Sequence, residues 1–213
     1  MSEILREAMV AAYQQLQAAG LGTGSSGNLS QRCGGGMLIT PTGVGPAELE
    51  PSQVVSMSLE GECESGQLLP SSEWHLHAAI YLARPDINAV VHCHSRHATI
   101  LACTHRPLPA VHYMIAITAM DEIPIAPYAT FGTLALAAST AAALGEKGLA
   151  CLLANHGQVA AGADLSRALR VALEVEELAA IYCGTLAIGG AQVLSPEDMA
   201  EVHKGFAHYG QQD

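Results

Sequence analysis

The tripeptide His92-Cys93-His94 carries the strongest chemical signal in the sequence. The apolar residues 89–91 before it predict a buried strand that ends in a polar segment. Side chains two residues apart in a strand point to the same face, so both imidazoles would converge on one point. Zinc favours imidazole nitrogen, but a catalytic zinc site needs three protein ligands. The pair alone leaves two interpretations open: part of a zinc site, or two histidines that face solvent at a strand end.

A third imidazole is available in Asn155-His156-Gly157, which follows an apolar segment at residues 149–153. That segment predicts a second buried strand. Gly157 permits a sharp backbone turn, so His156 could project from the strand end. A single histidine at such a position is usually an ordinary polar loop residue. Together with the first pair, however, it favours a site made of three histidines.

The segment Ser71-Ser72-Glu73 is predicted to begin a helix, because serine is a favoured N-cap residue. Glu73 would lie in the first turn, where the helix dipole favours a carboxylate without any catalytic role. His75 and His77 follow on the same helix. We expect these two histidines to be surface or partner contacts rather than metal ligands.

Three short segments could bind an anion without a cation: residues 24–28, Thr42-Gly43 and Ser71-Ser72. Backbone N–H groups in loops and at helix N-termini bind phosphate through oriented dipoles. Each segment alone is weak evidence, because neither a Walker loop nor a GxGxxG motif is present. Such neutral donors would nevertheless let a chain of net charge −11 hold a phosphate.

These residues must be positioned by helices and strands that the hydrophobic pattern predicts along the chain. Helices are expected over residues 3–19, from residue 70 onward, and over residues 96–103, 133–144, 165–188 and 196–206. Strands are expected from residue 28 onward and over residues 37–40, 54–59, 87–94 and 149–153. Residues 107–131 are expected to form short strands and loops. Strands interleaved with helices predict one domain, residues 1–213, whose central sheet is covered on both faces. Several consecutive strands lack a helix-length connection, so the sheet should be mixed.

Composition excludes several other classes of protein. With 213 residues and 50% hydrophobic content, the chain can build its own core. It has no apolar run near ~20 residues, which argues against a membrane span. The chain has 20 acidic and 9 basic residues, and this acidic excess argues against binding to nucleic acid. The N-terminus lacks the features of a signal peptide, and six cysteines occur without a CxxC pair, so we expect a cytoplasmic protein with buried free thiols.

Segments spread over nearly the whole chain resemble the class II zinc-dependent aldolase family, and within it the fuculose-phosphate branch. They are 24–30 (GSSGNLS), 38–43 (LITPTG), 70–74 (PSSEW), 89–94 (AVVHCH), 109–115 (PAVHYMI), 126–133 (APYATFGT), 155–157 (NHG) and 209–210 (YG). Two positions depart from the pattern. Ser25 keeps the hydroxyl of the threonine that is common in relatives, whereas Asn155 stands where the fuculose enzyme has histidine.

The resemblance implies a three-layer α/β/α sandwich with a mixed, mainly antiparallel sheet, assembled as a ring-shaped homotetramer with its sites between subunits. By position, His92, His94 and His156 would bind one Zn²⁺ per subunit. Glu73 would cap the metal at rest and act as the acid/base once substrate displaces it. The implied phosphate pocket consists of Ser25, Ser26, Gly27, Asn28, Thr42, Gly43, Ser71 and Ser72.

The implied reaction is retro-aldol cleavage of a ketose 1-phosphate to dihydroxyacetone phosphate and an aldehyde. L-Fuculose 1-phosphate and 5-deoxy- or 5-methylthio-ribulose 1-phosphate are the candidate substrates. Tyr113 and Tyr209 would serve the aldehyde end from a neighbouring subunit, and Phe131 would line the aldehyde pocket.

Other members of the family leave alternatives open. A pentulose-phosphate 4-epimerase makes and breaks the same bond but usually has Asp at the position of Glu73. A sugar-phosphate dehydratase or decarboxylase is possible on the same scaffold. A non-enzymatic module like the adducin head is a further alternative, but such proteins are expected to lack the three histidines.

Overall fold

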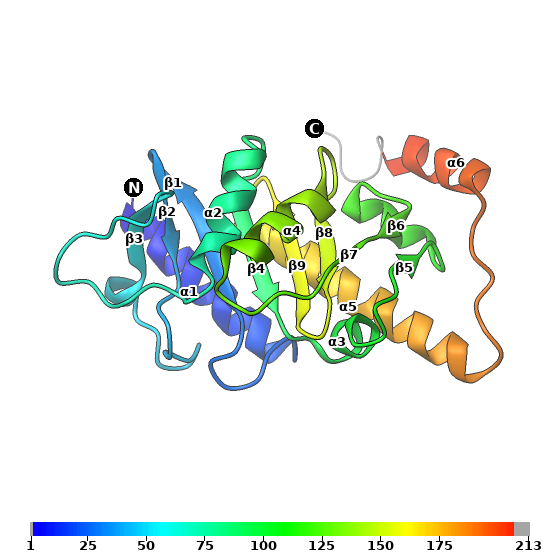
Figure 1. The fold of residues 1–213 in the computed structure, drawn as a ribbon, viewed down its shortest axis with the longest axis horizontal. Coiled ribbons are helices and arrows are strands. Elements are labelled where there is room, and N and C mark those ends of the chain that lie inside the picture. Colours follow the sequence, from blue (N-terminus) through cyan, green and yellow to red (C-terminus); the bar gives the residue numbers. More distant parts are fainter. Residues whose placement is uncertain (1, 207–213) are drawn as a thin grey trace.

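The computed structural model describes residues 2–206 and has a seven-stranded sheet at its centre (Figure 1). The strands follow the order β3-β2-β1-β4-β9-β8-β7, and every neighbouring pair is antiparallel except β7 and β8. Their bounds are β1 Asn28–Cys33, β2 Gly36–Ile39, β3 Val55–Ser58, β4 Ala89–Cys93, β7 Ile125–Ala126, β8 Ala150–Leu153 and β9 Gly157–Gly162. The prediction of a mixed, mainly antiparallel sheet is confirmed.

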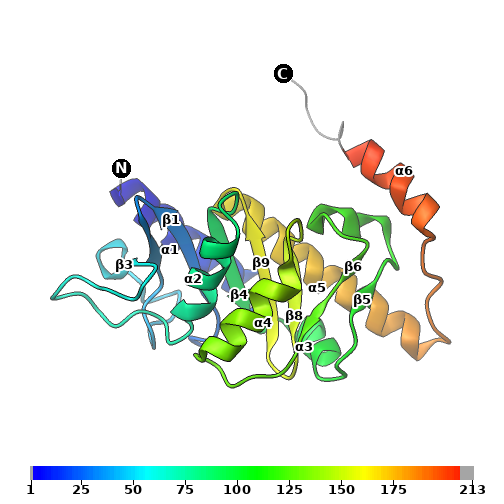
Figure 2. The same cartoon turned by 45° about the horizontal axis from the view of Figure 1, so that its top comes forward.

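Helices cover both faces of this sheet, so the fold has the three layers that the resemblance implied (Figures 1 and 2). One face carries α1 (Ser2–Ala18), α3 (Arg96–Ala102) and α5 (Leu165–Ala187), and the other carries α2 (Trp74–Ala83) and α4 (Leu134–Leu144). Each layer of helices buries its own apolar cluster against the sheet, which is the physical reason for a sandwich.

Strand β4 shows how the alternation of side chains serves both layers. Ala89 and Val91 pack in the cluster under α1, α3 and α5, whereas Val90 packs in the cluster under α2 and α4. His92 continues the face of Val90, because residues two apart share a face. Its imidazole is therefore directed towards the layer of α2, and it is fully buried there.

Most of the remaining elements lie at the end of the sheet formed by β7 and β8. A two-stranded sheet is formed by β5 (Leu108–Pro109) and β6 (Glu122–Ile123), and the 3₁₀ helix η2 (Tyr113–Thr118) lies between them in the chain. The last helix, α6 (Pro196–Phe206), packs on η2 and buries Met199. A second 3₁₀ helix, η1 (Pro51–Gln53), precedes β3.

Three expectations from the sequence need correction. Strand β9 was not predicted, although it forms the centre of the sheet beside β4. The helix expected from residue 70 begins only at Trp74. The six cysteines are free, as expected, but only Cys93 and Cys151 are buried; Cys63 and Cys103 are exposed. Burial raises the pKa of both buried thiols to about 12, which leaves them protonated.

Among residues 2–206, no helix has the length and apolar character that crossing a membrane requires.

Gly157 should be intolerant of a side chain, because β9 begins where β4 ends. A Cβ atom there would lie 2.4 Å from the carbonyl oxygen of Cys93 and 3.1 Å from Cδ2 of His94. We expect Gly157→Ala to lower the free energy of unfolding by about 1–3 kcal/mol, as overpacking does in a tight site. Urea unfolding measures this change.

The matched control is Gly184→Ala near the C-terminal end of α5, where a Cβ would meet nothing within 4 Å. Alanine should stabilise that helix by up to about 1 kcal/mol. If Gly157→Ala were as stable as the wild type, the close approach of β9 to β4 would be wrong.

Candidate metal centre and substrate cavity

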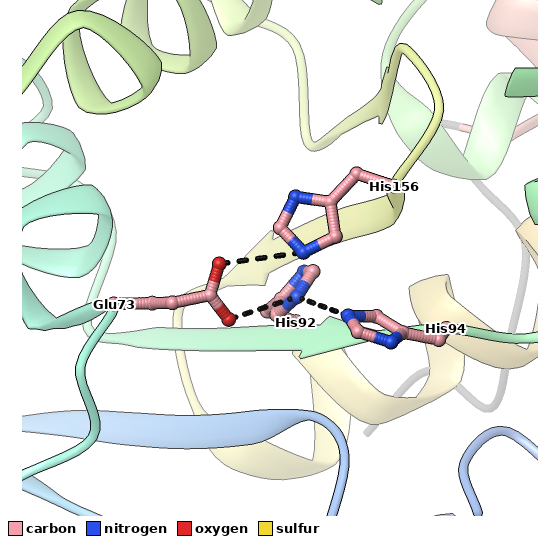
Figure 3. Close-up of side chains that lie close together, drawn as sticks. All are labelled: Glu73, His92, His94 and His156. Atoms are coloured by element: carbon pink, nitrogen blue, oxygen red, sulfur yellow. Dashed lines mark hydrogen bonds and ion pairs between the residues drawn. The ribbon is translucent and has the colours of Figure 1, made fainter. Parts of the chain in front are cut away.

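Four side chains from three separate parts of the chain converge at one point (Figure 3). The Nε2 atoms of His92 and His94 lie 3.0 Å apart. The Glu73 carboxylate places Oε2 3.2 Å from Nε2 of His92 and Oε1 3.4 Å from Nε2 of His156. The ligand atoms of all four residues lie within 4.8 Å of one another. The structure thus brings together the three histidines and the carboxylate that were singled out in the sequence.

The register of β4 places two of these imidazoles. His92 pairs with Asn28 of β1 on one side and with Val159 of β9 on the other. His94 follows the strand by one residue and lies on the same face as His92, as the spacing predicted.

The loop between β8 and β9 places His156. Leu153 pairs with Gly157, so only three residues connect the two strands. The left-handed conformation that closes the loop is adopted by Asn155, with φ 54°, and its Oδ1 lies 2.5 Å from Nε2 of His105. The prediction that Gly157 makes this turn is therefore wrong, because Gly157 does not adopt a positive φ. Gly157 is needed because its backbone passes close to Cys93, as described above.

Glu73 is held at the N-cap position of α2 rather than in its first turn. Its backbone N–H lies 3.3 Å from Oγ of Ser71, which accepts this hydrogen bond. The prediction that a serine caps this helix is wrong: Glu73 is the N-cap residue, α2 begins at Trp74, and Ser71 accepts the N–H of the N-cap residue itself. Only 7% of the surface of Glu73 is exposed, so its carboxylate lies in the cluster with little access to solvent.

The hydrogen bonds of the cluster require a positive charge at its centre. Nδ1 of His92 lies 2.9 Å from the carbonyl oxygen of Gln158, which can only accept, so Nδ1 carries a proton. In the neutral ring, Nε2 then carries a lone pair, which points at Oε2 of Glu73 and Nε2 of His94 and is repelled by the lone pairs of both atoms. Either a second proton on His92 or a cation removes this repulsion. Oε1 of Glu73 is also buried and has no hydrogen-bond partner among the described residues.

The pKa values follow from this crowding. Burial raises the pKa of Glu73, but the charge of His92 and hydrogen bonds from His92 and Asn28 outweigh it and hold the pKa well below its usual range. Burial lowers the pKa of His92, and the attraction of Glu73 reverses that shift and raises it. Burial, followed by the charge of His92, lowers the pKa of His94 and of His156 to about 4.

At neutral pH the cluster therefore offers the neutral imidazoles of His94 and His156, the carboxylate of Glu73, and the imidazole of His92, whose Nε2 faces that carboxylate. Three histidines and one carboxylate are a donor set that fits a divalent cation.

A cavity of about 310 Å³ opens onto this cluster, and Glu73, His94 and His156 form part of its wall. All residues that the resemblance assigned to a phosphate pocket line it: Ser25, Ser26, Gly27, Asn28, Thr42, Gly43, Ser71 and Ser72. Phe131 lines it as well and is 65% exposed. The lining residues include no lysine or arginine. The cavity therefore offers an anion hydroxyl and N–H groups instead of a cationic side chain.

The two tyrosines assigned to the aldehyde end are placed differently. Tyr113 belongs to η2, is about half exposed, and is not among the residues that line the cavity. Its ring contacts those of His112 and Phe206. Tyr209 lies outside the described residues.

Sequence reasoning missed two contributors to the site. His77 is not a surface contact: it is fully buried, and its Nε2 lies 2.6 Å from Oδ1 of Asn28. Tyr128 lines the cavity and is 61% exposed. The spacing of His77, four residues after Glu73 on one helix face, was the available signal.

Comparison with known proteins agrees with the fold and the cluster. Residues 7–183 match the family model of the Class II Aldolase and Adducin N-terminal domain. The chain is 45% identical over 206 residues to the 5-methylthioribulose-1-phosphate/5-deoxyribulose-1-phosphate aldolase of Rhodospirillum rubrum, covering 97% of this chain and 92% of that protein. It is 47% identical over 197 residues to the L-fuculose phosphate aldolase of Escherichia coli K12, covering 92% and 91%. A solved L-fuculose 1-phosphate aldolase superposes with a TM-score of 0.91 at 39% identity, covering 95% of each chain.

With a matching family model over most of its length and a four-residue metal-binding cluster in place, the chain belongs to the class II aldolase and adducin N-terminal domain family. Within that family it is a class II aldolase, a metal-dependent carbon–carbon lyase. The alternative of a non-enzymatic binding module is thereby set aside.

Metal content tests the cluster directly. Purified protein incubated with Zn²⁺ and then dialysed should retain about one ion per chain, and His156→Ala should retain much less, because two imidazoles and a carboxylate make a weaker site. Elemental analysis measures both. The control is His203→Ala on α6, which removes only an exposed contact with Asp121. Full metal content in His156→Ala would contradict the assignment.

Proposed function

We propose that this chain cleaves a ketose 1-phosphate to dihydroxyacetone phosphate and an aldehyde, with L-fuculose 1-phosphate or a 5-deoxy- or 5-methylthio-ribulose 1-phosphate as the substrate. One observation carries the proposal: a carboxylate and three imidazoles meet at the wall of a cavity whose remaining wall offers neutral N–H and O–H groups. The names of the relatives at 45% and 47% identity support the same substrates.

The proposed metal is Zn²⁺, one per subunit, bound by His92, His94 and His156 with Glu73 as a fourth ligand at rest. Zinc accepts imidazole nitrogen and carboxylate oxygen in four-coordinate sites. When bound, such an ion supplies Lewis-acid chemistry that polarises substrate oxygens and stabilises the negative charge that develops on them.

The neutral wall of the cavity would hold the phosphate group. Ser71 and Ser72 stand at the start of α2, where helix N–H groups favour an anion. Gly43, with φ 74°, and the loop of Ser25, Ser26 and Gly27 face the same space. Holding the phosphate here fixes the carbon chain relative to Glu73, and fixed geometry is itself a large part of the rate.

Glu73 would remove a proton from C3 of the three-carbon fragment and return it there. Glu73 lines the cavity, and its buried Oε1 has no hydrogen-bond partner among residues 2–206, so this oxygen is the one left to accept or return a proton. The low pKa makes this carboxylate a weak base while it faces the imidazoles. We therefore expect substrate to move it away from their charge, which raises its proton affinity.

The aldehyde end would be completed by a neighbouring subunit of a homotetramer. Tyr113 does not line the cavity of its own chain, and its half-exposed ring is available to another copy. We assign Tyr113 and Tyr209 to proton handling at the C4 oxygen across that interface, with Phe131 at the mouth of the cavity as an apolar contact for the aldehyde.

The substrate assignment is tested with a panel of ketose 1-phosphates and the zinc-loaded protein. Release of dihydroxyacetone phosphate from at least one member is expected, and the ratio of kcat/KM values ranks the aldehydes. Conversion of a pentulose 5-phosphate to its C4 epimer, without release of a three-carbon product from any member, would contradict the proposal.

The division of labour between Glu73 and Tyr113 is tested with dihydroxyacetone phosphate alone in deuterated solvent. The wild type should exchange one C3 proton, because this half-reaction needs no aldehyde. Glu73→Gln keeps the size but cannot accept a proton, so exchange and cleavage should both fall by about 10²–10⁴-fold. Tyr113→Phe should retain exchange while cleavage falls.

Proton NMR follows the exchange, and a coupled assay follows the cleavage. Equal loss of both activities in Tyr113→Phe, with metal content and oligomeric state unchanged, would show that the assigned roles are wrong.

A further inference from the structure

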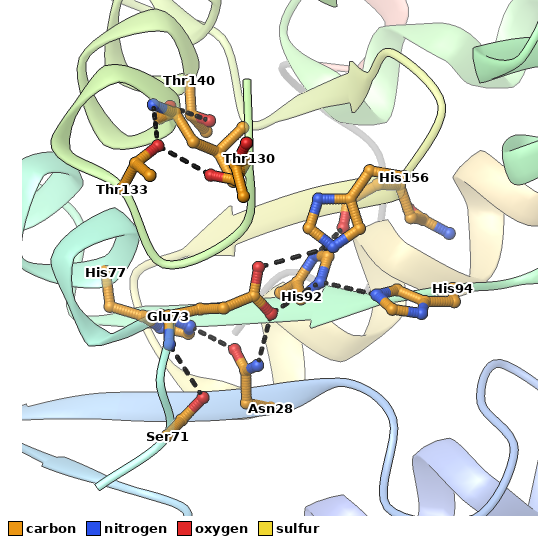
Figure 4. Close-up of polar contacts among 12 residues, drawn as sticks. Asn28, Ser71, Glu73, His77, His92, His94, Thr130, Thr133, Thr140 and His156 are labelled. Carbon is orange, nitrogen blue, oxygen red and sulfur yellow. Dashed lines mark hydrogen bonds and ion pairs between the residues drawn. The ribbon is translucent and has the colours of Figure 1, made fainter. Parts of the chain in front are cut away.

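A continuous row of buried polar groups leads from Glu73 into the protein on the α2 side of the sheet. Its first members are shown in Figure 4: Nδ2 of Asn28 lies 3.0 Å from Oε2 of Glu73, and Oδ1 of the same amide lies 2.6 Å from Nε2 of His77. Beyond them, Nδ1 of His77 lies 2.7 Å from Oγ of Ser30, which lies 2.7 Å from the hydroxyl of Tyr81. These five side chains are all at least nine-tenths buried.

The carboxylate at one end fixes the direction of every hydrogen bond in the row. An ionised carboxylate only accepts, so the Asn28 amide must present its NH₂ group to Glu73 and its oxygen to His77. Nε2 of His77 must then be the protonated nitrogen. Burial is the main cause that lowers the pKa of His77 to about 3, so the ring is neutral and its Nδ1 accepts from Ser30. The Tyr81 hydroxyl in turn donates to Ser30.

This direction excludes the second orientation of the Asn28 amide. If the amide were rotated by half a turn, its oxygen would face Oε2 of Glu73 and its NH₂ would face Nε2 of His77. The two oxygens would repel each other at a buried site, which is costly, and His77 could accept the NH₂ only by moving its proton to Nδ1, which would reverse the hydrogen bond with Ser30. His77 thus acts on Glu73 without touching it.

We infer that His77 is a positioning residue for the acid/base carboxylate: it locks the Asn28 amide, which ties Oε2 of Glu73 to β1 and leaves Oε1 as the oxygen that exchanges a proton with substrate. Oε2 has Asn28 at 3.0 Å and His92 at 3.2 Å, whereas Oε1 lies 3.4 Å from Nε2 of His156 and has no hydrogen bond among the described residues. The inference rests on the proposed function, in which Glu73 carries the proton. It gives Asn28 a role in orienting the carboxylate besides its place in the cavity wall.

Two substitutions at the same position separate the two contacts of His77. In His77→Gln, the side-chain amide nitrogen lies as far from Cα as Nε2 of histidine does. The donor to Asn28 is therefore kept, and the contact with Ser30 is lost. In His77→Asn, the shorter side-chain amide reaches only as far as Nδ1 of histidine, so its oxygen keeps the contact with Ser30 and the donor to Asn28 is lost. Both variants act at the same buried place, although His77→Asn removes one methylene group more than His77→Gln, so urea unfolding of both accompanies the kinetics and each is then the control for the other.

We expect His77→Asn to lose about 10–100-fold in kcat for cleavage and in C3 exchange of dihydroxyacetone phosphate, measured at full metal occupancy, as misplacement of a catalytic group does. KM should change little. His77→Gln should stay within a few-fold of the wild type. Equal kcat values for the two variants, a loss confined to KM, or a loss that disappears once metal occupancy is restored would each overturn the inference.

A second measurement requires neither activity nor a variant that folds. Two-bond ¹H–¹⁵N correlation spectra of the wild type, with His77 assigned, distinguish an imidazole protonated on Nε2 from one protonated on Nδ1. The inference predicts the Nε2–H form, and the Nδ1–H form would overturn it. If the wild type shows this form but neither cleaves ketose 1-phosphates nor exchanges the C3 proton, then the proposed function fails while the hydrogen-bond row stands.

Discussion

The carboxylate of Glu73 is almost entirely removed from water, and the arrangement around it keeps it charged there. An isolated carboxylate in such a place would be very costly. Here it is met by His92 and His156 and by the amide of Asn28. These partners come from β4, from the β8–β9 loop and from β1, so the charge can be held only when the central strands are in register. The same crowding of imidazole lone pairs makes the cluster a receptor for a divalent cation.

Much of this arrangement could be predicted from the sequence because strand periodicity is a strong constraint. His92 and His94 share a face since they are two apart, and His156 follows an apolar strand, so three histidines were found from spacing alone. Strand β9 was missed because small residues follow its Gly157 and carry little strand propensity. The burial of His77 could not be predicted, since whether a helix face meets solvent or a sheet is decided by strands far away in the sequence. For the same reason, the hydrogen bond from Asn28 to Glu73 could not be predicted. The turn was assigned to Gly157 because glycine readily adopts a positive φ. At this position glycine is needed for another reason, which is that β9 passes close to the backbone of β4.

The cavity resolves an electrostatic difficulty posed by the whole chain. A net charge of −11 disfavours anionic ligands at long range. The wall nevertheless offers hydroxyl and N–H groups at short range, and a divalent cation in the cluster would add positive charge beside them. Specificity for the aldehyde is a separate matter. Phe131 and Tyr128 lie exposed at the cavity and Tyr113 lies away from it, so the proposed assignment of these side chains to the aldehyde requires a second copy of the chain.

If this assignment of the cluster is right, one divalent cation binds where the four side chains meet. Anomalous diffraction at the zinc absorption edge, from crystals of the zinc-loaded protein, tests this most directly. We expect one peak per chain within bonding distance of Nε2 of His92, His94 and His156. A principal peak elsewhere, or one that contacts fewer than three of these imidazoles, would contradict it.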